Sequence, residues 1–370
     1  MMFRNCLLLA LAALATAKTT TWKELHAYTF ADYVSEFGRD YAHGSAEHAT
    51  RAALFHANLR TIRAHNADPE KTWKMGVNAF TDRTPEEVKG RKGLDRASLF
   101  EAPERALHRA APREHDPTET HLLPLEVDWR TMGVVTDVKD QGQCGSCWTF
   151  AATEVLESSV AIATGNLMTF SEQQWVSCVN NTAECGGTGG CEGGTAEMVY
   201  AAAITEGITT EDNYPYTAKD DACKSGDIQP VANVTGQVRL PRNKYAPLLW
   251  AVATQGPIAI SVDAGWSLYE SGVFAAADGG TTIDHAVVLV GYGTDEASGT
   301  DFWLVRNSWG PDWGEDGYIR LERRADGLPC GVDEANMDGV GCAGDPDTVE
   351  VCGTSAILYD TSYPTGAYLL

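Results

Sequence analysis

The chain has 370 residues and a formal net charge of −23 at pH 7, so it is long enough for a leader and one or two sizeable domains. Residues 18–122 carry 16 basic and 16 acidic residues, whereas residues 123–370 carry 11 basic and 35 acidic ones. This excess of carboxylates excludes nucleic acid as a favoured partner, because phosphate binding needs positive charge. The acidic part fits two interpretations: a low-pH compartment, where protonation relieves self-repulsion, or simple solubility.

Residues 1–17 have the pattern of a secretory signal peptide. Arg4 supplies the positive end, Leu7 to Leu14 form a short apolar core, and Ala15-Thr16-Ala17 offers a small-residue cleavage site. The apolar run is too short to span a bilayer, and we expect no membrane span elsewhere. The sequence therefore predicts a chain in the secretory pathway, bound for a lysosome, a vacuole or the extracellular space.

Two patterns mark the region that follows the signal. The first has steps of three and four residues, which place its members along one face of a helix: Glu47, Arg51, Phe55, Asn58, Ile62 and Asn66. Glu47 and Arg51 also have the spacing of an ion pair within a helix. The second pattern alternates at period two, as in a short strand: Gly76, Asn78, Phe80 and Asp82.

These two patterns resemble the two motifs of the inhibitory propeptide in cathepsin L-like members of the papain family of cysteine proteases. The resemblance implies that residues 18–122 are a propeptide that inhibits the enzyme within the same chain. Residues 97–122, interrupted by Pro103, Pro112 and Pro117, predict an exposed linker that is easily cut. Maturation cleavage is then expected near its end, which leaves residues 123–370 as the peptidase domain.

The candidate nucleophile lies in the run Gln141-Gly142-Gln143-Cys144-Gly145-Ser146-Cys147-Trp148. Residues 149–164 predict a helix, so Cys147 lies at the helix's N-terminal end, where a thiol pKa is lowered and the thiolate is favoured. The run Cys-Gly-Ser-Cys-Trp is the known local signature of this family. From these residues alone, an ordinary disulfide cysteine or a Cys144–Cys147 redox pair stays open.

The candidate base and its partner lie far downstream. His285 is the single histidine after His121, and it precedes the buried-strand pattern Ala286 to Val290. Asn307 follows a second predicted strand, residues 302–306. A structural histidine is the alternative, but a cysteine protease needs an imidazole to pair with its thiolate and a group to orient that imidazole.

The resemblance assigns a role to each of these residues. His285 holds Cys147 as a thiolate, and Asn307 orients the imidazole under the cover of Trp309, which also belongs to the substrate-binding set. The Gln141 side-chain amide and the Cys147 backbone N–H donate to the oxyanion that develops during reaction.

Substrate contacts follow from the same resemblance. Gly193 and Gly194 match positions that offer backbone groups to an extended substrate, although a tight turn is an alternative interpretation. Ala196, Ser261 and Ile283 match positions that line the pocket for the residue two before the cut. Because these side chains are small or apolar, we expect an apolar residue there, the P2 position.

Cysteines other than Cys6 and Cys147 number eight, an even set. The resemblance implies the bridges Cys144–Cys191 and Cys178–Cys223. Three pairings remain open for the last four, and a zinc site is their alternative use: Cys185, Cys330, Cys342 and Cys352. We predict no metal and no cofactor.

The chain departs from the family pattern near its C-terminus. The family's Cys-Gly motif occurs twice, at Cys330-Gly331 and Cys352-Gly353, with an acidic segment between them, so the residue at the floor of the specificity pocket is ambiguous. The stretch from Cys178 to Cys191 is also longer than in papain. It contains no histidine, unlike the cleft-blocking insertion of cathepsin B-like enzymes, which favours an open cleft and endopeptidase action.

Together these features predict an α+β papain-like fold, with a helical lobe, an antiparallel barrel-like lobe and an N-terminal helical propeptide. The predicted function is a cysteine endopeptidase made as a secreted zymogen and acting as a monomer on peptides and proteins. Asn180 and Asn233 begin glycosylation tripeptides. The rival functions are a catalytically silent binding protein on the same fold and a thiol–disulfide oxidoreductase.

Overall fold

The structure, a computed structural model, describes residues 20–93, 122–224, 226 and 229–370. The predicted signal peptide and residues 97–121 of the predicted linker lie outside the described residues. Among the described helices, none is both long enough and apolar enough to cross a membrane.

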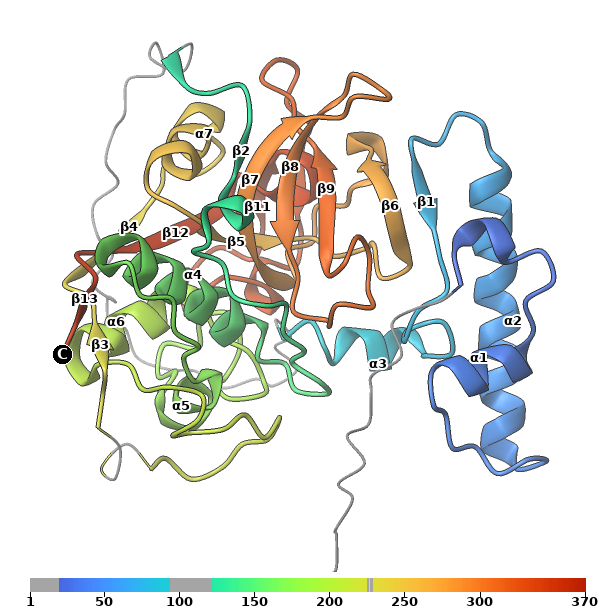
Figure 1. The fold of residues 1–370 in the computed structure, drawn as a ribbon, viewed down its shortest axis with the longest axis horizontal. Helices are drawn as coiled ribbons and strands as arrows, with labels where there is room; N and C mark the ends of the chain where they lie inside the picture. The colour runs from blue at the N-terminus through green and yellow to red at the C-terminus, as the bar shows by residue number, and fades with distance from the viewer. Residues whose placement is uncertain (1–19, 94–121, 225, 227–228) are drawn as a thin grey trace, which may run out of the picture.

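The N-terminal region is a small helical unit beside the main body (Figure 1). It contains η1 (Trp22–Glu24), α1 (Phe30–Glu36), α2 (Ala46–Ala67) and α3 (Pro85–Lys89). The Ser45 side chain caps α2 by accepting from the His48 N–H, as helix N-termini favour. Phe55 and Ile62 of the predicted stripe are fully buried in a separate aromatic core, so α2 packs its stripe inward.

One nine-stranded sheet connects this unit to the rest of the chain. Its order is β1-β6-β9-β8-β7-β5-β12-β4, and β2 also pairs with β7. The strands are β1 (Trp73–Met75), β2 (Val127–Asp128), β4 (Gly236–Arg239), β5 (Ile258–Val262), β6 (Tyr269–Phe274), β7 (His285–Thr294), β8 (Asp301–Arg306), β9 (Tyr318–Glu322) and β12 (Asp360–Thr365). The propeptide region supplies β1, which pairs antiparallel with β6 through Trp73 and Gly272.

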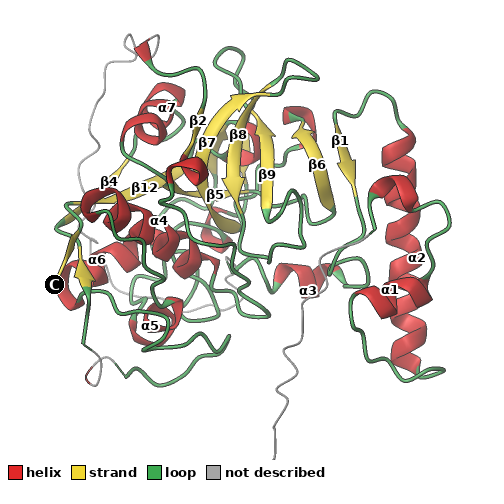
Figure 2. Ribbon diagram, in the orientation of Figure 1, coloured by secondary structure: helices red, strands yellow, loops and turns green. Residues whose placement is uncertain are grey.

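The remaining elements form two small sheets and the helical lobe, which lies on the opposite side of the sheet from α2 (Figures 1 and 2). The small sheets pair β10 (Cys330–Asp333) with β11 (Val349–Cys352) and β3 (Ala232–Asn233) with β13 (Tyr368–Leu369). The longer helices are α4 (Cys147–Thr164), α5 (Glu172–Cys178), α6 (Ala196–Glu206) and α7 (Tyr245–Thr254). Short 3-10 turns are η3 (Trp129–Met132), η5 (Ala276–Asp278), η6 (Asn336–Asp338) and η7 (Thr354–Ala356).

Helix α4 and strand β7 form the junction of the two lobes. Both are apolar and almost wholly buried, and α4 packs directly against β7. The N-terminal ends of the two elements meet, because the N–H of Ala286, the second residue of β7, lies 3.4 Å from the Sγ of Cys147, the first residue of α4. The predicted α+β architecture is therefore confirmed, and its central packing brings together residues that are far apart in sequence.

The predicted strand over Gly76 to Asp82 is wrong. The strand β1 ends at Met75, and the following residues form a turn. The Asn78 side chain accepts from the Phe80 N–H at 2.9 Å, and the Asn78 carbonyl accepts from the Thr81 N–H at 3.0 Å. Local hydrogen bonds between a side chain and the backbone compete with the hydrogen bonds of a sheet. The alternation of residue types in the sequence does not reveal this competition.

Candidate active site

Cys147 is buried at the first position of α4, and it is the free cysteine among the described residues. The helix N-terminus places positive partial charge beside its sulfur. The Ala286 N–H donates to the Cys147 Sγ, and the thiol in turn donates to the Lys92 carbonyl at 2.7 Å. A peptide carbonyl of the propeptide region therefore lies directly on the candidate nucleophile.

His285 begins β7, and its orientation is determined by one neighbour. Its Nε2 lies 2.8 Å from the Asn307 Oδ1, which also accepts from the Ser308 N–H at 2.8 Å. The second bond identifies the Asn307 oxygen as the acceptor, so Nε2 carries a proton and Nδ1 is left toward the sulfur side. That Nδ1 lies 3.4 Å from the same Lys92 oxygen that the Cys147 thiol contacts.

A tryptophan covers the imidazole. Trp309 stacks on His285 with 4.8 Å between ring centroids, and Phe80 of the propeptide region lies 4.8 Å from Trp309 on its own side. This apolar cover keeps water away from the His285–Asn307 bond and so strengthens it.

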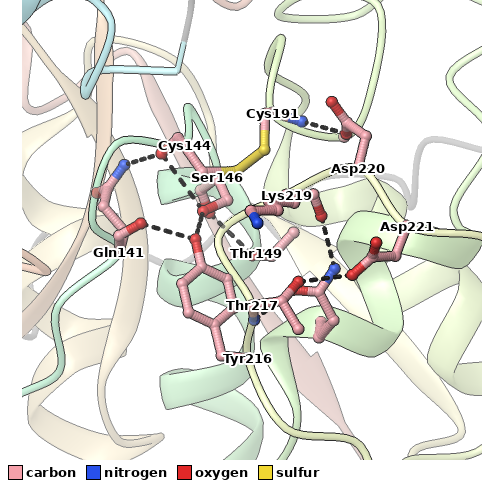
Figure 3. The surroundings of a disulfide bond; sticks show 12 residues. Gln141, Cys144, Ser146, Thr149, Cys191, Tyr216, Thr217, Lys219, Asp220 and Asp221 are labelled. Atoms are coloured by element: carbon pink, nitrogen blue, oxygen red, sulfur yellow. Dashed lines mark hydrogen bonds between the residues drawn. A yellow bond between two sulfur atoms is a disulfide. The ribbon is translucent and has the colours of Figure 1, made fainter.

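Gln141 lies beside the nucleophile as a hydrogen-bond donor. Its Nε2 donates to the Arg91 carbonyl at 2.6 Å and to the Cys144 carbonyl at 2.9 Å. The Ser308 hydroxyl donates to the Gln141 Oε1 at 2.6 Å, which identifies the nitrogen as the end that faces the site. Figure 3 shows Gln141 beside Tyr216, whose hydroxyl donates to the Gln141 backbone carbonyl at 2.8 Å.

The stretch Arg91 to Gly93 runs through the site and was not found by sequence reasoning. Its carbonyls contact Gln141 and Cys147, and the Lys92 Nζ forms an ion pair with Asp284 at 2.7 Å. Gly93 has a positive φ of 68°, and a Cβ there would collide with the Gly145 carbonyl. Two basic residues and a glycine form no recognisable sequence motif, so only the docked structure identifies this stretch as part of the site.

Burial determines the charge of the pair in this docked form. Desolvation raises the pKa of the Cys147 thiol to about 12 and lowers the pKa of the His285 imidazole to about 4. The docked site therefore holds a neutral thiol and a neutral imidazole, in agreement with the thiol's donation to the Lys92 carbonyl. The thiolate–imidazolium pair expected from the sequence is not the state of this form, because the propeptide excludes the water that would solvate it.

The two candidate substrate glycines make close backbone contacts. A Cβ on Gly193 would collide with the Gly93 carbonyl, and one on Gly194 would lie 2.8 Å from the Trp148 ring. Gly193 also has a φ of 95°, where glycine is favoured. A side chain on Gly193 would therefore displace the chain in the cleft, and one on Gly194 would displace the Trp148 ring.

The other candidate pocket residues lie on two elements and in the loop that precedes β7. Ala196 begins α6, Ser261 lies in β5, and the buried Ile283 lies two residues before His285. The Ser261 hydroxyl donates to the Asp360 carboxylate at 2.8 Å, which also accepts from Arg239 at 2.5 Å. Asp360 is the polar partner of Ser261, and sequence reasoning missed it because the doubled Cys-Gly motif left the alignment there ambiguous.

The cysteines form four disulfides among the described residues. Cys144 bonds to Cys191 (Figure 3) and Cys178 to Cys223. The four cysteines left open by the sequence pair as Cys185–Cys342 and Cys330–Cys352. All four of these sulfurs are therefore used in bridges rather than as zinc ligands, and Cys144 is not paired with Cys147.

A free cysteine at a helix start, an imidazole oriented by an asparagine, and a facing amide donor define a thiol–imidazole site of the kind used in acyl transfer. Residues 123–340 match the papain family of cysteine proteases, and residues 30–88 match the cathepsin propeptide inhibitor domain. The chain therefore belongs to the papain family of cysteine proteases and carries the family's propeptide domain, as predicted.

Its relatives include plant enzymes. The chain is 42% identical to oryzain beta chain of Oryza sativa subsp. japonica over 284 residues, which are 75% of this chain and 58% of that protein. It is 39% identical to senescence-specific cysteine protease SAG39 of the same organism, over 86% of this chain and 91% of the relative. A solved structure of recombinant stem bromelain precursor is similar with a TM-score of 0.74 and 33% identity, covering 91% of this chain and 97% of that one. The chain thus spans less than two thirds of oryzain beta chain but nearly all of SAG39.

Proposed function

We propose that the matured chain is a cysteine peptidase that hydrolyses peptide bonds with Cys147 and His285. The observation that carries this proposal is the peptide already lying in the site. One carbonyl of the Arg91–Gly93 stretch contacts the Cys147 thiol at 2.7 Å, and the preceding carbonyl accepts from the Gln141 amide at 2.6 Å. The site is thus shaped for a peptide backbone and presents a nucleophile and a donor to its carbonyls.

The mechanism follows from these positions. Once the propeptide leaves, water solvates the pair, the thiol proton moves to the His285 Nδ1, and the thiolate attacks the substrate carbonyl carbon. The oxyanion accepts from the Gln141 Nε2 and the Cys147 N–H. Imidazolium gives its proton to the leaving amine, and a thioester remains. His285 then deprotonates a water that attacks the thioester, which releases the acid and restores the thiol. Asn307 keeps Nε2 engaged, so that Nδ1 faces the reaction throughout.

The pocket residues support a preference for an apolar side chain at P2. Ala196 and Ile283 offer apolar surface, and the hydroxyl of Ser261 is engaged by Asp360 rather than directed at a ligand. The Asp360 charge is in turn paired with Arg239 rather than directed at the substrate. Endopeptidase action is the expectation from the sequence.

We further propose that residues 18–122 act as an intramolecular inhibitor of a monomeric zymogen, removed by cleavage within the linker in a compartment of the secretory pathway. Trp73 and Lys71 anchor this region, since both donate to the Asp278 carboxylate, at 2.7 and 2.6 Å. Together with the β1–β6 pairing, these contacts hold the Arg91–Gly93 stretch on the nucleophile.

Alkylation tests the proposal directly. We expect iodoacetamide to label Cys147 alone in the matured, unreduced protein, with loss of peptide hydrolysis in step with labelling. The zymogen reacts much more slowly, because burial raises the pKa of its thiol to about 12. Peptide mapping by mass spectrometry identifies the labelled residue. Label on Cys144, or full activity after complete labelling of Cys147, would contradict the proposal and favour a redox pair.

We propose that acidification releases the propeptide, but protonation of Glu47 in the predicted Glu47–Arg51 ion pair contributes little to this release. The closest N–O distance of the pair is 3.9 Å, and the Glu47 side chain is 61% exposed, so it contributes little. Arg51 instead binds Glu87 through two bonds, at 2.6 and 2.7 Å, and lowers the pKa of that carboxyl to about 2. Because the folded state lowers this pKa, the ion pair stabilises the fold fully at pH values above the pKa of the unfolded chain, about 4.5. This stability is lost only as pH falls from about 4.5 toward 2.

His65 is a partly buried imidazole at the junction of α2 and β1. Its ring lies 4.1 Å from the Trp73 ring and its Nε2 lies 3.1 Å from the Trp73 carbonyl, beside Lys71, Lys74 and Asp278. Burial lowers its pKa, so the docked form holds it neutral. That stability is complete above the unfolded pKa of about 6.5 and declines as pH falls below it.

We therefore expect the zymogen to mature several-fold faster at pH 5 than at pH 7, and we expect His65→Gln to lose most of that acceleration. His56→Gln, at an exposed position of the same helix, is the matched control and keeps the wild-type ratio. Gel analysis of timed samples measures both rates. An unchanged pH ratio in His65→Gln would show that another group is the trigger.

A further inference from the structure

The acidic insertion between the two Cys-Gly motifs begins on the sheet lobe. We call residues 334–343 the bridging segment. It follows β10, whose last residue, Asp333, accepts from the Ile283 N–H at 3.1 Å. A Cβ on Gly339 would collide with the Ile283 carbonyl. The bridging segment therefore lies against the residue that stands two positions before His285.

The other end of the bridging segment is attached to the helical lobe. Cys342 is bonded to Cys185, the Gly186 N–H donates to the Gly341 carbonyl at 3.0 Å, and the Ala343 N–H donates to the Ala183 carbonyl at 2.8 Å. These partners belong to the lengthened loop that follows α5 and leads to Gly193 and Gly194. One covalent bond and two hydrogen bonds thus fasten the two insertions to each other.

The contacts of three glycines show where this connection crosses the cleft. A Cβ on Gly186 would lie 2.8 Å from the Gly194 carbonyl and 3.1 Å from the Gly339 carbonyl. A Cβ on Gly193 would collide with the carbonyls of both Gly186 and Gly93. Gly93 itself contacts the nucleophile's surroundings at Gly145. The connection is therefore the immediate neighbour of the chain that occupies the site, and it touches both walls, Gly194 on one lobe and Ile283 on the other.

We propose that the bridging segment closes the N-terminal side of the cleft, so that the mature enzyme accepts no more than two residues before the cut and removes them from free N-termini. This inference rests on the proposed function, in which Gly194 and Ile283 flank the P2 residue. It makes the enzyme an N-terminal exopeptidase and replaces the open cleft expected from the lack of histidines in the Cys178–Cys191 stretch. A chain that continues further toward its N-terminus meets the bridging segment.

Two carboxylates lie next to the bridging segment and to Ile283, in a cavity that the propeptide region covers. Asp338 of the bridging segment and Asp284 line a cavity of about 550 Å³ between the propeptide region and the peptidase domain, together with Lys92. In the zymogen the Lys92 ammonium is bound by Asp284 at 2.7 Å. That cation leaves with the propeptide, whereas Asp338 and Asp284 remain. An incoming ammonium is attracted there, and an acetylated N-terminus is not.

The test compares two peptides of about ten residues and identical sequence, one with a free and one with an acetylated N-terminus. The acid-matured wild-type enzyme is incubated with each, and mass spectrometry follows the products. We expect fragments of one or two residues from the free peptide, and at least about tenfold slower hydrolysis of the acetylated peptide. Internal cleavage of the acetylated peptide at a comparable rate overturns the inference while leaving the proposed function intact. Cleavage of neither peptide overturns both.

A pair of double variants tests the role of the bridging segment itself. Cys185→Ser with Cys342→Ser releases the segment from the helical lobe, and we expect hydrolysis of the acetylated peptide to rise about tenfold relative to the free one. Cys178→Ser with Cys223→Ser removes a bridge elsewhere on the same lobe and is the matched control. Alkylation of Cys147 counts the folded active sites in each preparation. The same substrate ratio in both double variants, with sites intact, contradicts the role given to the segment.

Discussion

Replacing Cys147 with Ala abolishes peptide hydrolysis, with an expected loss of about a millionfold in turnover, the size seen when another hydrolase loses its nucleophile. The reason is that every later step passes through the thioester on this sulfur, which alanine cannot form. The described residues contain no second free cysteine that could substitute for it. The measurement is hydrolysis of a fluorogenic peptide at pH 5 with the matured variant.

The Cys147→Ala variant cannot mature itself if the proposal is correct, so wild-type enzyme must cut it in trans and then be removed. The variant zymogen should remain folded, because alanine fits the space of the thiol and loses only the bonds to Ala286 and Lys92. Circular dichroism of the zymogen provides this control. Activity within tenfold of wild type would remove Cys147 from the mechanism.

Replacing Gln141 with Ala is expected to lower turnover about a hundred- to a thousandfold, the usual cost of one oxyanion donor. Its Nε2 is held toward the site by the Ser308 hydroxyl on the opposite amide atom. Because the contact serves the transition state, kcat should fall much more than KM rises. Gln141→Glu should behave like the alanine variant, since it keeps the shape but replaces the donor with an acceptor.

Gln143→Ala is the matched control, because Gln143 lies two residues away and is exposed. Steady-state kinetics on one peptide compare the three variants with wild type. The Gln141 variants should also bind the propeptide less tightly, since the Gln141 amide donates to the Arg91 carbonyl in the zymogen. A loss of turnover below tenfold in Gln141→Ala would assign the oxyanion to other donors.

Local patterns in the sequence predicted those features that depend on neighbours along the chain. Cys147 was expected at the N-terminal end of a helix, and α4 begins at that residue. His285 was expected at the start of a buried strand, and β7 begins there. The helical stripe predicted α2, with Phe55 and Ile62 inward. Helix and strand patterns repeat over a few residues, so a single sequence is enough to predict these elements.

Partners that approach from distant parts of the chain could not be predicted in the same way. Arg51 has Glu47 at ion-pair spacing in sequence, yet its stronger partner is Glu87 of α3, because the fold brings that carboxylate closer. The alternation from Gly76 to Asp82 suggested a strand, but the Asn78 side chain forms a turn. Spacing alone carries no information about such bonds.

The sequence by itself determined the family and its propeptide domain, because short motifs specify them. It also predicted the nucleophile with its partners, from the same motifs and the single remaining histidine. The tertiary structure alone decided that the docked pair is neutral, since burial of Cys147 and His285 under the Arg91–Gly93 stretch sets their protonation. It also decided that Cys185 pairs with Cys342. The sequence leaves three pairings open for the four cysteines concerned. Cys185 and Cys342 are 157 residues apart, and only the folded chain brings these two sulfurs together.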